Sequence, residues 1–250
     1  MKATDTIADG PAEAASGTRA DWVYRRLAAD ILSGRLAPGT KLAFHLLTDH
    51  YGVSVSTARE ALQRLAGEQL VVGEGHRGFR VAPLSAAELA DINGLRLLLE
   101  PRALRDSIQH GDAAWEERVL LASHRLARLQ RPEDLRSVEA DVWEQHHRDF
   151  HDALLSACGS PWTLQFCRTL YDRFTRYRRL LVSQYVTSPR LRAGVGAEHK
   201  SLLQAALGRD ADRAVAVLVQ HYGNTARRVL AHYEPARTGE VGVKARRRTS

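Results

Sequence analysis

Residues 52–81 read GVSVSTAREALQRLAGEQLVVGEGHRGFRV, so a helical pattern runs directly into a short, basic stretch spaced by glycines. On a helix that begins after Ser54, small and apolar side chains share one face, namely Ala58, Ala61, Leu62 and Leu65. The opposite face is polar and carries Ser56, Arg59, Glu60 and Gln63. One side of this helix is therefore suited to packing, whereas the other is free to meet a partner.

The chain around this helix has the pattern of a winged helix-turn-helix. A short helix is expected over 44–50, and Gly52 ends it before Ser54 opens the next helix, expected over 55–69. The second helix of such a motif can enter the major groove of DNA, where the planar fork of an arginine contacts guanine or phosphate. The following stretch reads as a β-hairpin whose tip carries His76 and Arg77. Helix pairs with short turns also occur in proteins that bind no DNA. In such a protein Arg59 would be an ordinary solvated residue.

The composition indicates a folded protein with an anionic partner. Of its 250 residues 44% are hydrophobic, and the formal net charge is +7 with a pI near 9.8. Part of that charge lies in the tail KARRRTS, which can simply be solvated. No apolar run is long enough to cross a bilayer and the N-terminus is polar, so we expect a cytoplasmic protein. Cys158 and Cys167 lack metal-ligand spacing and are expected to be small buried hydrophobes.

An apolar period close to 3.6 runs through most of the chain and predicts a mainly α-helical fold. The first helix is expected over 19–33, and the capping box SAAE at 85–88 starts a long helix that reaches about His110. Further helix starts are expected at Asp112, at Ser160 followed by Pro161, and at Asp210. The expected parts are a disordered tail (1–18), a winged helix-turn-helix domain (19–82), an all-helical domain (85–233) and a basic disordered tail (234–250).

Three stretches in order, VYRRLAADILSGRLAPGTKL, YGVSVSTAREALQRLAGEQLV and HRGFRVAPLS, resemble the winged helix-turn-helix of the GntR family of bacterial transcription regulators. The helical remainder, with GLRLLLEPRA, HRDFHDALLSACGSP and EHKSLLQAALGRDADRA, is similar to the ligand-sensing domain of the FadR-type (FCD) branch. The resemblance implies a homodimeric, effector-responsive regulator, more commonly a repressor, that reads a palindromic operator in double-stranded DNA. The residues expected to contact DNA are Ser54, Ser56, Thr57, Arg59, Gln63, Arg64, His76, Arg77 and Gly78.

Two positions depart from the family's pattern in this region. The family usually has an arginine directly after the serine of GVS, where this chain has Val55, and an acidic residue where this chain has Phe44. A good bidentate contact between an arginine and a base is worth about 1–3 kcal/mol of discrimination. We therefore expect the operator to differ from the family's usual one.

Four histidines lie on the apolar faces of the expected helices. His147 and His151 are four residues apart and share a face with Trp143, Leu154 and Leu155, whereas Asp149 lies nearly opposite. His199 shares a stripe with Leu202, Leu203 and Ala206, and His221 shares one with Val217, Leu218 and Thr225. A lone buried histidine is usually a hydrogen-bonded core residue, but four that converge are most simply satisfied by a divalent cation.

The family resemblance adds a ligand set to this pattern. Many FCD domains bind a metal through an aspartate and three histidines, and His151, His199 and His221 match those histidines. His147 stands in place of the aspartate, which would shift the site towards nitrogen-preferring metals such as Zn or Ni. The alternative is a degenerate site in which His147 merely lines an effector pocket.

The resemblance also implies an effector with a carboxylate, a small organic acid that binds at the metal. Arg96 is expected to supply a second anionic contact, or else a surface or interface ion pair with Glu100. Arg173 and Tyr177 are weaker candidates for effector binding.

The sequence leaves two other functions open. A metal-dependent hydrolytic enzyme would need an acid or nucleophile beside the histidines, and the sequence places none there, so we expect no enzymatic activity. The second rival is the same regulator with a metal-free pocket for an acyl or aromatic effector.

Overall fold

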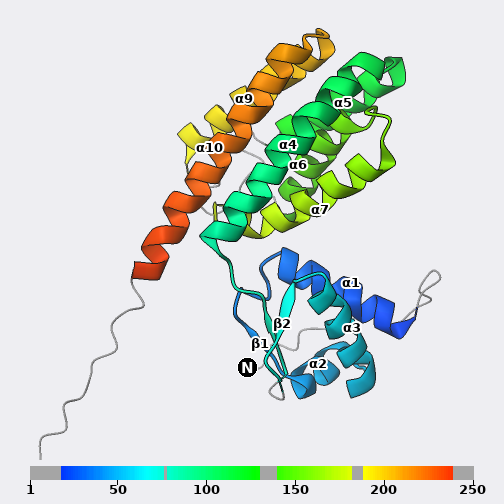
Figure 1. Ribbon diagram of the computed structural model, residues 1–250, viewed down its shortest axis with the longest axis vertical. Coiled ribbons are helices and arrows are strands. Elements are labelled where there is room, and N and C mark those ends of the chain that lie inside the picture. Colours follow the sequence, from blue (N-terminus) through cyan, green and yellow to red (C-terminus); the bar gives the residue numbers. More distant parts are fainter. Residues whose placement is uncertain (1–17, 76–77, 130–139, 182–187, 239–250) are drawn as a thin grey trace, which may run out of the picture. The chain divides into compact units, whose positions relative to one another are not determined.

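The structure, a computed structural model, describes residues 18–75, 78–129, 140–181 and 188–238. Most of these residues are helical, one small antiparallel sheet accompanies them, and the chain divides into two compact units between Pro83 and Leu84 (Figure 1). The predicted fold class, mainly α with a winged helix-turn-helix and a helical bundle, is confirmed. None of the described helices combines the length and the apolar character that a membrane crossing needs.

In the first unit, helices and a small sheet surround one apolar core. The elements are α1 (Arg19–Leu32), β1 (Lys41–Leu42), α2 (Phe44–Tyr51), α3 (Val55–Gly67), β2 (Val71–Gly73) and β3 (Phe79–Val81). Helix α1 begins at Thr18, which forms a capping box with Asp21, and α2 ends at Gly52, whose φ of 60° is left-handed. The four α3 residues expected to pack, Ala58, Ala61, Leu62 and Leu65, are completely buried.

The sheet has the order β1–β3–β2 and is antiparallel throughout. Val71 pairs with Val81 and Gly73 with Phe79, which makes the expected hairpin. The third strand, β1, was not expected, because two residues are too few to show an alternating pattern. It pairs with β3 through Leu42, which is buried in the core of this unit.

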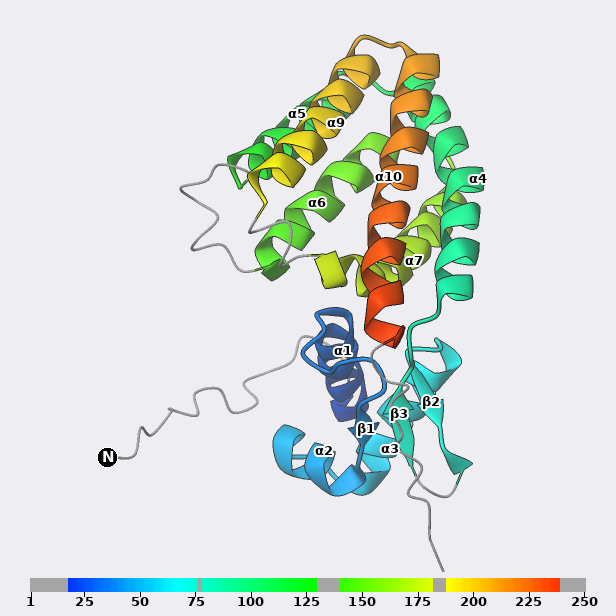
Figure 2. The same cartoon turned by 90° about the vertical axis from the view of Figure 1, so that its left-hand side faces the viewer.

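The second unit is a bundle of helices. The elements are α4 (Ala86–His110), α5 (Ala113–Arg128), α6 (Ala140–Leu155), α7 (Pro161–Arg178), the 3-10 turn η2 (Arg179–Leu181), α9 (Pro189–Leu207) and α10 (Ala211–Thr238). Helix α10 lies along α4 and beside α9, and α7 packs against α4 (Figure 2). A large apolar cluster with Trp115, Phe150, Leu202 and Leu218 at its centre fills the space between these helices.

Helix starts in this unit follow the expected signals. The side chains of Ser85, Asp112 and Ser160 accept hydrogen bonds from the first turns of α4, α5 and α7, and Asp210 does the same for α10. Ser188 followed by Pro189 starts α9 in the same way as Ser160 and Pro161 start α7, although this helix start was not among the expected ones. Helix α10 continues to Thr238, past the expected start of the basic tail at 234.

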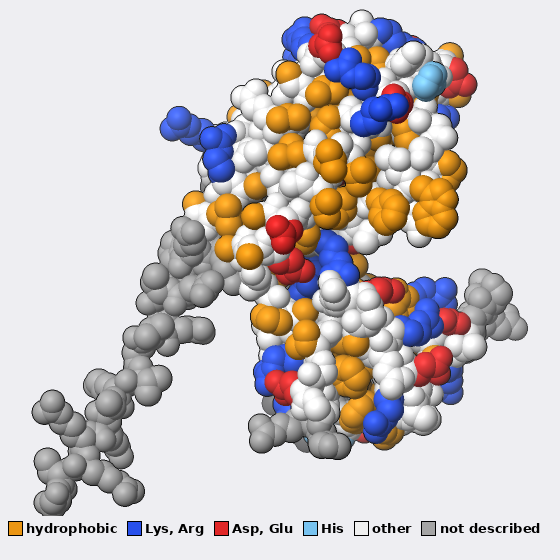
Figure 3. Space-filling model, in the orientation of Figure 1, with side chains coloured by type: hydrophobic (Ala, Val, Ile, Leu, Met, Phe, Trp, Pro, Cys, Tyr) orange, Lys and Arg blue, Asp and Glu red, His pale blue; other side chains and the backbone are white. Residues whose placement is uncertain are grey.

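Two neighbouring helices keep large apolar side chains in contact with solvent. Leu95 and Leu98 of α4 are 49% and 70% exposed, and Trp162 and Phe166 of α7 are 69% and 55% exposed. Figure 3 shows apolar side chains gathered on the face of the helical unit that is turned to the viewer. We call Leu95, Leu98, Trp162 and Phe166 the α4–α7 apolar face.

Candidate functional site

The start of α3 presents a group of hydroxyls. The Ser54 hydroxyl accepts a hydrogen bond from the backbone N–H of Thr57 at 3.2 Å and lies 2.8 Å from the Ser56 hydroxyl. It also lies 2.9 Å from the Thr57 hydroxyl. Ser54 and Ser56 are exposed. Because a helix N-terminus carries partial positive charge and free N–H groups, this end of α3 favours a phosphate.

Arg59 and Gln63 lie on the exposed side of α3. The Arg59 guanidinium lies 4.9 Å from the centre of the Phe44 ring. Among the described residues no carboxylate pairs with Arg59, so its charge is not neutralised locally. Val55, four residues before Arg59 on the same helix, exposes an apolar side chain.

Arg64 is held against α1 instead of standing free. Its Nη1 lies 2.5 Å from Asp21 Oδ1, and its guanidinium lies 4.2 Å from the centre of the Tyr24 ring. The hydrogen bond from Arg64 lowers the pKa of Asp21 to about 2, with help from Thr18. Arg64 therefore has a partner that the sequence pattern did not reveal.

The hairpin between β2 and β3 forms the wing. The backbone N–H of Glu74 donates to Gly78 O at 2.8 Å and closes the turn, and Gly75 and Gly78 have φ of 59° and 99°, values that favour glycine. His76 and Arg77, the expected tip, lie outside the described residues. Arg80 is paired with Glu74 at 2.7 Å.

The four histidines expected to converge do so in the second unit. His147 and His151 project from α6, His199 from α9 and His221 from α10, and all four are buried. One potential ligand atom from each lies within 4.8 Å of the others. Their ring centroids are 4.5 Å apart for His147 and His151 and 4.8 Å apart for His199 and His221. We call these four residues the histidine cluster.

Burial keeps these imidazoles uncharged. It lowers the pKa of His147, His151 and His199 well below the usual value, and the nearby Arg178 and the other imidazoles add to the effect. The pKa of His221 is also lowered by burial, against the opposing effect of Glu198. Neutral imidazole is the form that binds a metal ion, so the cluster is ready to bind one at neutral pH.

Groups behind the histidines hold them in place. His147 Nδ1 lies 2.7 Å from the Tyr171 hydroxyl, and His221 Nδ1 lies 2.6 Å from Glu198 Oε2. His151 Nδ1 is 3.4 Å from the Tyr222 hydroxyl. Tyr171, Tyr222 and Glu198 were not among the expected site residues, because their positions in the chain give no sign of these contacts.

The residues present fit a transition metal. Four imidazoles with no thiolate or carboxylate among them suit ions such as Zn²⁺ or Ni²⁺, whereas Mg²⁺ and Ca²⁺ prefer oxygen ligands. Within the described part of the chain, the buried His151 Nε2 has no hydrogen-bond partner, as expected of a nitrogen reserved for a metal. Asp149 lies apart from the cluster, where it accepts a hydrogen bond from Gln145 at 2.8 Å.

The three expected effector residues have different surroundings. Arg96 forms the expected ion pair with Glu100, with its Nε 2.8 Å from Glu100 Oε1, but the pair is buried and does not lie at the surface as expected. The Arg96 guanidinium lies 3.8 Å from the centre of the Tyr222 ring, beside the histidine cluster. Tyr177 instead donates to Glu88 at the start of α4, and Arg173 is half-buried on the same helix as Tyr177.

Comparisons with known proteins agree with this architecture. The family model described as bacterial regulatory proteins of the gntR family matches residues 19–81, and the FCD domain model matches residues 91–224. The HTH-type transcriptional regulator BphR of Paraburkholderia xenovorans is 43% identical over 203 residues, which cover 79% of this chain and 80% of BphR. The HTH-type transcriptional repressor GlaR of Escherichia coli is 36% identical over 198 residues, which cover 79% of this chain and 90% of GlaR.

Solved structures share the fold. The structure of Escherichia coli McbR/YncC matches with a TM-score of 0.72 at 19% identity and covers 87% of this chain and 100% of McbR/YncC. A GntR regulator from Rhodococcus matches with a TM-score of 0.70 at 21% identity and covers 86% of this chain and 99% of that protein. The chain belongs to the GntR family and carries an FCD domain. It is a DNA-binding transcriptional regulator, and its family and relatives are regulators, not enzymes.

Proposed function

We propose that this regulator represses transcription as a homodimer on a palindromic operator, and that a small organic acid bound at a metal in the histidine cluster releases it. The observation that carries the proposal is a set of four buried histidines from three helices. One potential ligand nitrogen from each of them lies within 4.8 Å of the others. A relative that is named as a repressor supports the direction of regulation. For the acid to release DNA, it must bind one arrangement of the dimer more tightly than the other.

The proposed DNA contacts lie on α3 and on the wing. Ser54, Ser56 and Thr57 would bind phosphate at the start of α3, and Arg59 and Gln63 would reach the major groove from its exposed side. The wing would add His76, Arg77 and Gly78. Arg64 would contribute less to DNA binding than Arg59, because its guanidinium already pairs with Asp21.

The α4–α7 apolar face supports a dimer. Soluble monomers rarely leave many large apolar side chains exposed on one pair of helices, and a second copy would cover Leu95, Leu98, Trp162 and Phe166 with the same face of its own chain. Two-fold symmetry would then present two α3 helices to the two halves of a palindrome.

The proposed metal is Zn²⁺ or Ni²⁺, with His147, His151, His199 and His221 as ligands. The effector's carboxylate would occupy a further coordination position, and Arg96 would attract its negative charge from behind Tyr222. We leave Tyr177 out of this site because its hydroxyl is engaged by Glu88 and by the Ser85 N–H, and we leave Arg173 out with it.

The test of the metal site is elemental analysis of the full chain after chelator stripping and reloading with zinc. We expect about one zinc per wild-type chain and far less in His151→Ala. His146→Ala is the matched control, because His146 lies on the same helix, half-buried, outside the cluster. Equal zinc in wild type and His151→Ala would contradict the site.

Operator binding separates the metal-dependent regulator from one with a metal-free pocket. Zinc-loaded and stripped protein are titrated onto a fragment of the protein's own upstream region while a panel of mono-, di- and hydroxycarboxylic acids is added. Release by an acid from zinc-loaded protein alone supports the proposal. Release that is equal in stripped protein would favour the metal-free pocket.

A further inference from the structure

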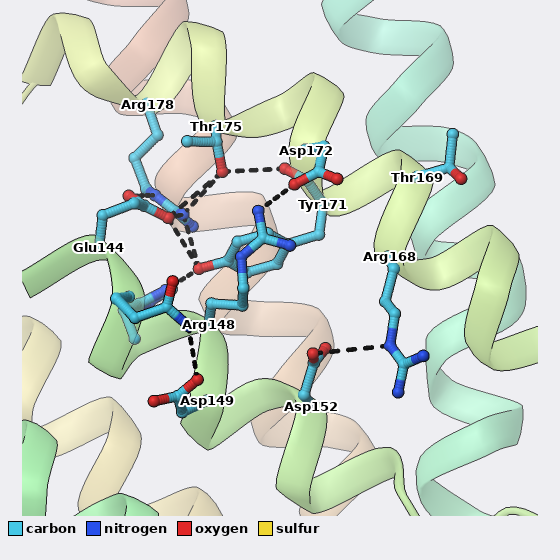
Figure 4. Close-up of polar contacts among 12 residues, drawn as sticks. Glu144, Arg148, Asp149, Asp152, Arg168, Thr169, Tyr171, Asp172, Thr175 and Arg178 are labelled. Carbon is cyan, nitrogen blue, oxygen red and sulfur yellow. Dashed lines mark hydrogen bonds and ion pairs between the residues drawn. The ribbon is translucent and has the colours of Figure 1, made fainter. Parts of the chain in front are cut away.

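A buried hydrogen-bond relay stands behind His147. The Tyr171 hydroxyl lies 2.7 Å from His147 Nδ1, donates to Glu144 Oε1 at 2.9 Å and accepts from Arg178 Nη2 at 2.8 Å. Arg178 also pairs with Glu144 through its Nε at 3.2 Å and through Nη2. Figure 4 shows Glu144, Tyr171 and Arg178 converging on one point between α6 and α7.

The hydrogen-bond donors and acceptors of this relay determine which ring nitrogen of His147 carries the proton. A tyrosine hydroxyl has a single proton, and an ionised carboxylate can only accept. Glu144 is paired with Arg178 and its Oε1 lies 2.9 Å from the Tyr171 hydroxyl, so the Tyr171 proton must point to Glu144, because two acceptor oxygens would otherwise face each other. His147 must then donate its own Nδ1–H to the Tyr171 oxygen, which leaves the lone pair on Nε2.

The environment of Tyr171 supports this assignment. Tyr171 is buried, and its hydroxyl lies within hydrogen-bond distance of Glu144, Arg178 and His147. With the His147 and Arg178 N–H groups as donors and Glu144 as acceptor, the hydroxyl has all the hydrogen bonds it can make. No other placement of the protons satisfies every buried group.

The same arrangement recurs behind His151. Its Nδ1 lies 3.4 Å from the Tyr222 hydroxyl, Tyr222 donates to Glu100, and Glu100 accepts from Arg96 Nε at 2.8 Å. Each of these two histidines is thus backed by a tyrosine, a glutamate and an arginine, which two helices supply in each case. The repetition argues that the relay serves the histidines, since packing alone has no need of two buried ion pairs.

We infer that Tyr171 is a positioning residue that fixes the proton of His147 on Nδ1, so that Nε2 becomes the metal-binding nitrogen. The inference rests on the proposed metal site and deepens it. It makes His147 a ligand held in one tautomer and not a residue that lines a pocket. It also assigns to Glu144 and Arg178 the task of holding the Tyr171 hydroxyl in place.

The first test reads the tautomer in metal-free protein. Long-range ¹H–¹⁵N correlation spectra of the full chain, with ¹⁵N-labelled histidine, show which ring nitrogen is protonated, and a His147→Gln variant assigns the signal. We expect His147 to carry its proton on Nδ1. Tyr171→Phe removes the acceptor, so the His147 signal should shift to Nε2–H or to a mixture of both forms. A wild-type His147 protonated on Nε2 overturns the inference.

The second test reads zinc affinity by competition with a chelator. Loss of an outer-shell partner typically weakens metal binding about 10- to 100-fold, which is the loss expected for Tyr171→Phe. Tyr177→Phe is the matched control, because Tyr177 is a second buried tyrosine of α7 and its hydroxyl donates to Glu88 of α4. This variant should leave both readouts unchanged. If Tyr171→Phe does not fold, Glu144→Gln is measured in its place, with the same loss of the fixed tautomer expected.

The outcomes separate this inference from the proposed metal site. Unchanged tautomer and unchanged zinc affinity in the folded variant overturn the role of Tyr171. A wild type with the proton on Nδ1 that binds no zinc supports the relay and refutes the metal site instead.

Discussion

Replacing Arg59 with alanine tests the DNA-binding face most sharply. The Arg59 guanidinium is exposed, lies over the Phe44 ring at 4.9 Å, and has no carboxylate partner among the described residues, so its whole charge is available to phosphate. Each phosphate contact contributes about 0.9 to the slope of log affinity against log salt. A dimer carries two copies, so Arg59→Ala should reduce that slope by about 1.8. Over a fourfold change in salt this is about a twelvefold difference in affinity.

The assay is fluorescence anisotropy with an operator fragment at several salt concentrations. Arg118→Ala is the matched control, because Arg118 is exposed on α5 of the helical unit and its loss changes the net charge equally. We expect Arg118→Ala to keep the wild-type slope. An Arg59→Ala protein with the wild-type slope and affinity would refute the contact, and an equal change in both variants would show only a general charge effect.

Three further predictions concern the helical unit. Glu198→Ala should weaken zinc binding about 10- to 100-fold, because Glu198 Oε2 holds His221 Nδ1 at 2.6 Å, and Glu198→Gln should lose less since its amide oxygen can still accept. Chelator competition measures both. Metal-free protein should become less stable as the pH falls below about 6.5. The histidines of the unfolded chain bind protons in this range, whereas the buried histidines of the folded chain, whose pKa is lowered, stay neutral. Each histidine can lower the free energy of unfolding by up to about 1.4 kcal/mol per pH unit. Urea unfolding at a series of pH values measures this slope, and a flat profile would contradict the burial of neutral imidazoles. Gly111→Ala should destabilise the chain by about 1–3 kcal/mol, because a Cβ there would lie 2.5 Å from the Trp115 ring and 2.7 Å from Ser107 O. Gly94→Ala, where a Cβ would meet nothing within 4 Å, should not destabilise it in the same denaturation assay.

Local patterns in the sequence were enough to predict the helices. The spacing of Ala58, Ala61, Leu62 and Leu65 identified the buried face of α3, because a helix repeats every 3.6 residues whatever it packs against. The same periodicity placed the four histidines on apolar faces, and the structure brings them together. Element β1 escaped notice because its two residues become a strand only through pairing with β3.

Contacts between distant parts of the chain account for the rest. Asp21 lies 43 residues from Arg64, and Tyr171 lies 24 residues from His147, so no spacing rule connects either pair. Arg96 and Glu100 are an i,i+4 pair that the sequence does show, but its burial depends on Tyr222, 122 residues after Glu100. Packing between helices, and not the pattern within one helix, decides which polar groups stand behind the histidine cluster.

The most direct test of the central claim is X-ray absorption spectroscopy of the zinc-loaded chain. The histidine cluster predicts a first shell of nitrogen at about 2.0–2.1 Å with the scattering signature of imidazole from His147, His151, His199 and His221. Loss of one imidazole in His147→Ala should be visible in the same spectrum. A shell with sulfur at about 2.3 Å, or an imidazole count that does not change in His147→Ala, would contradict the account.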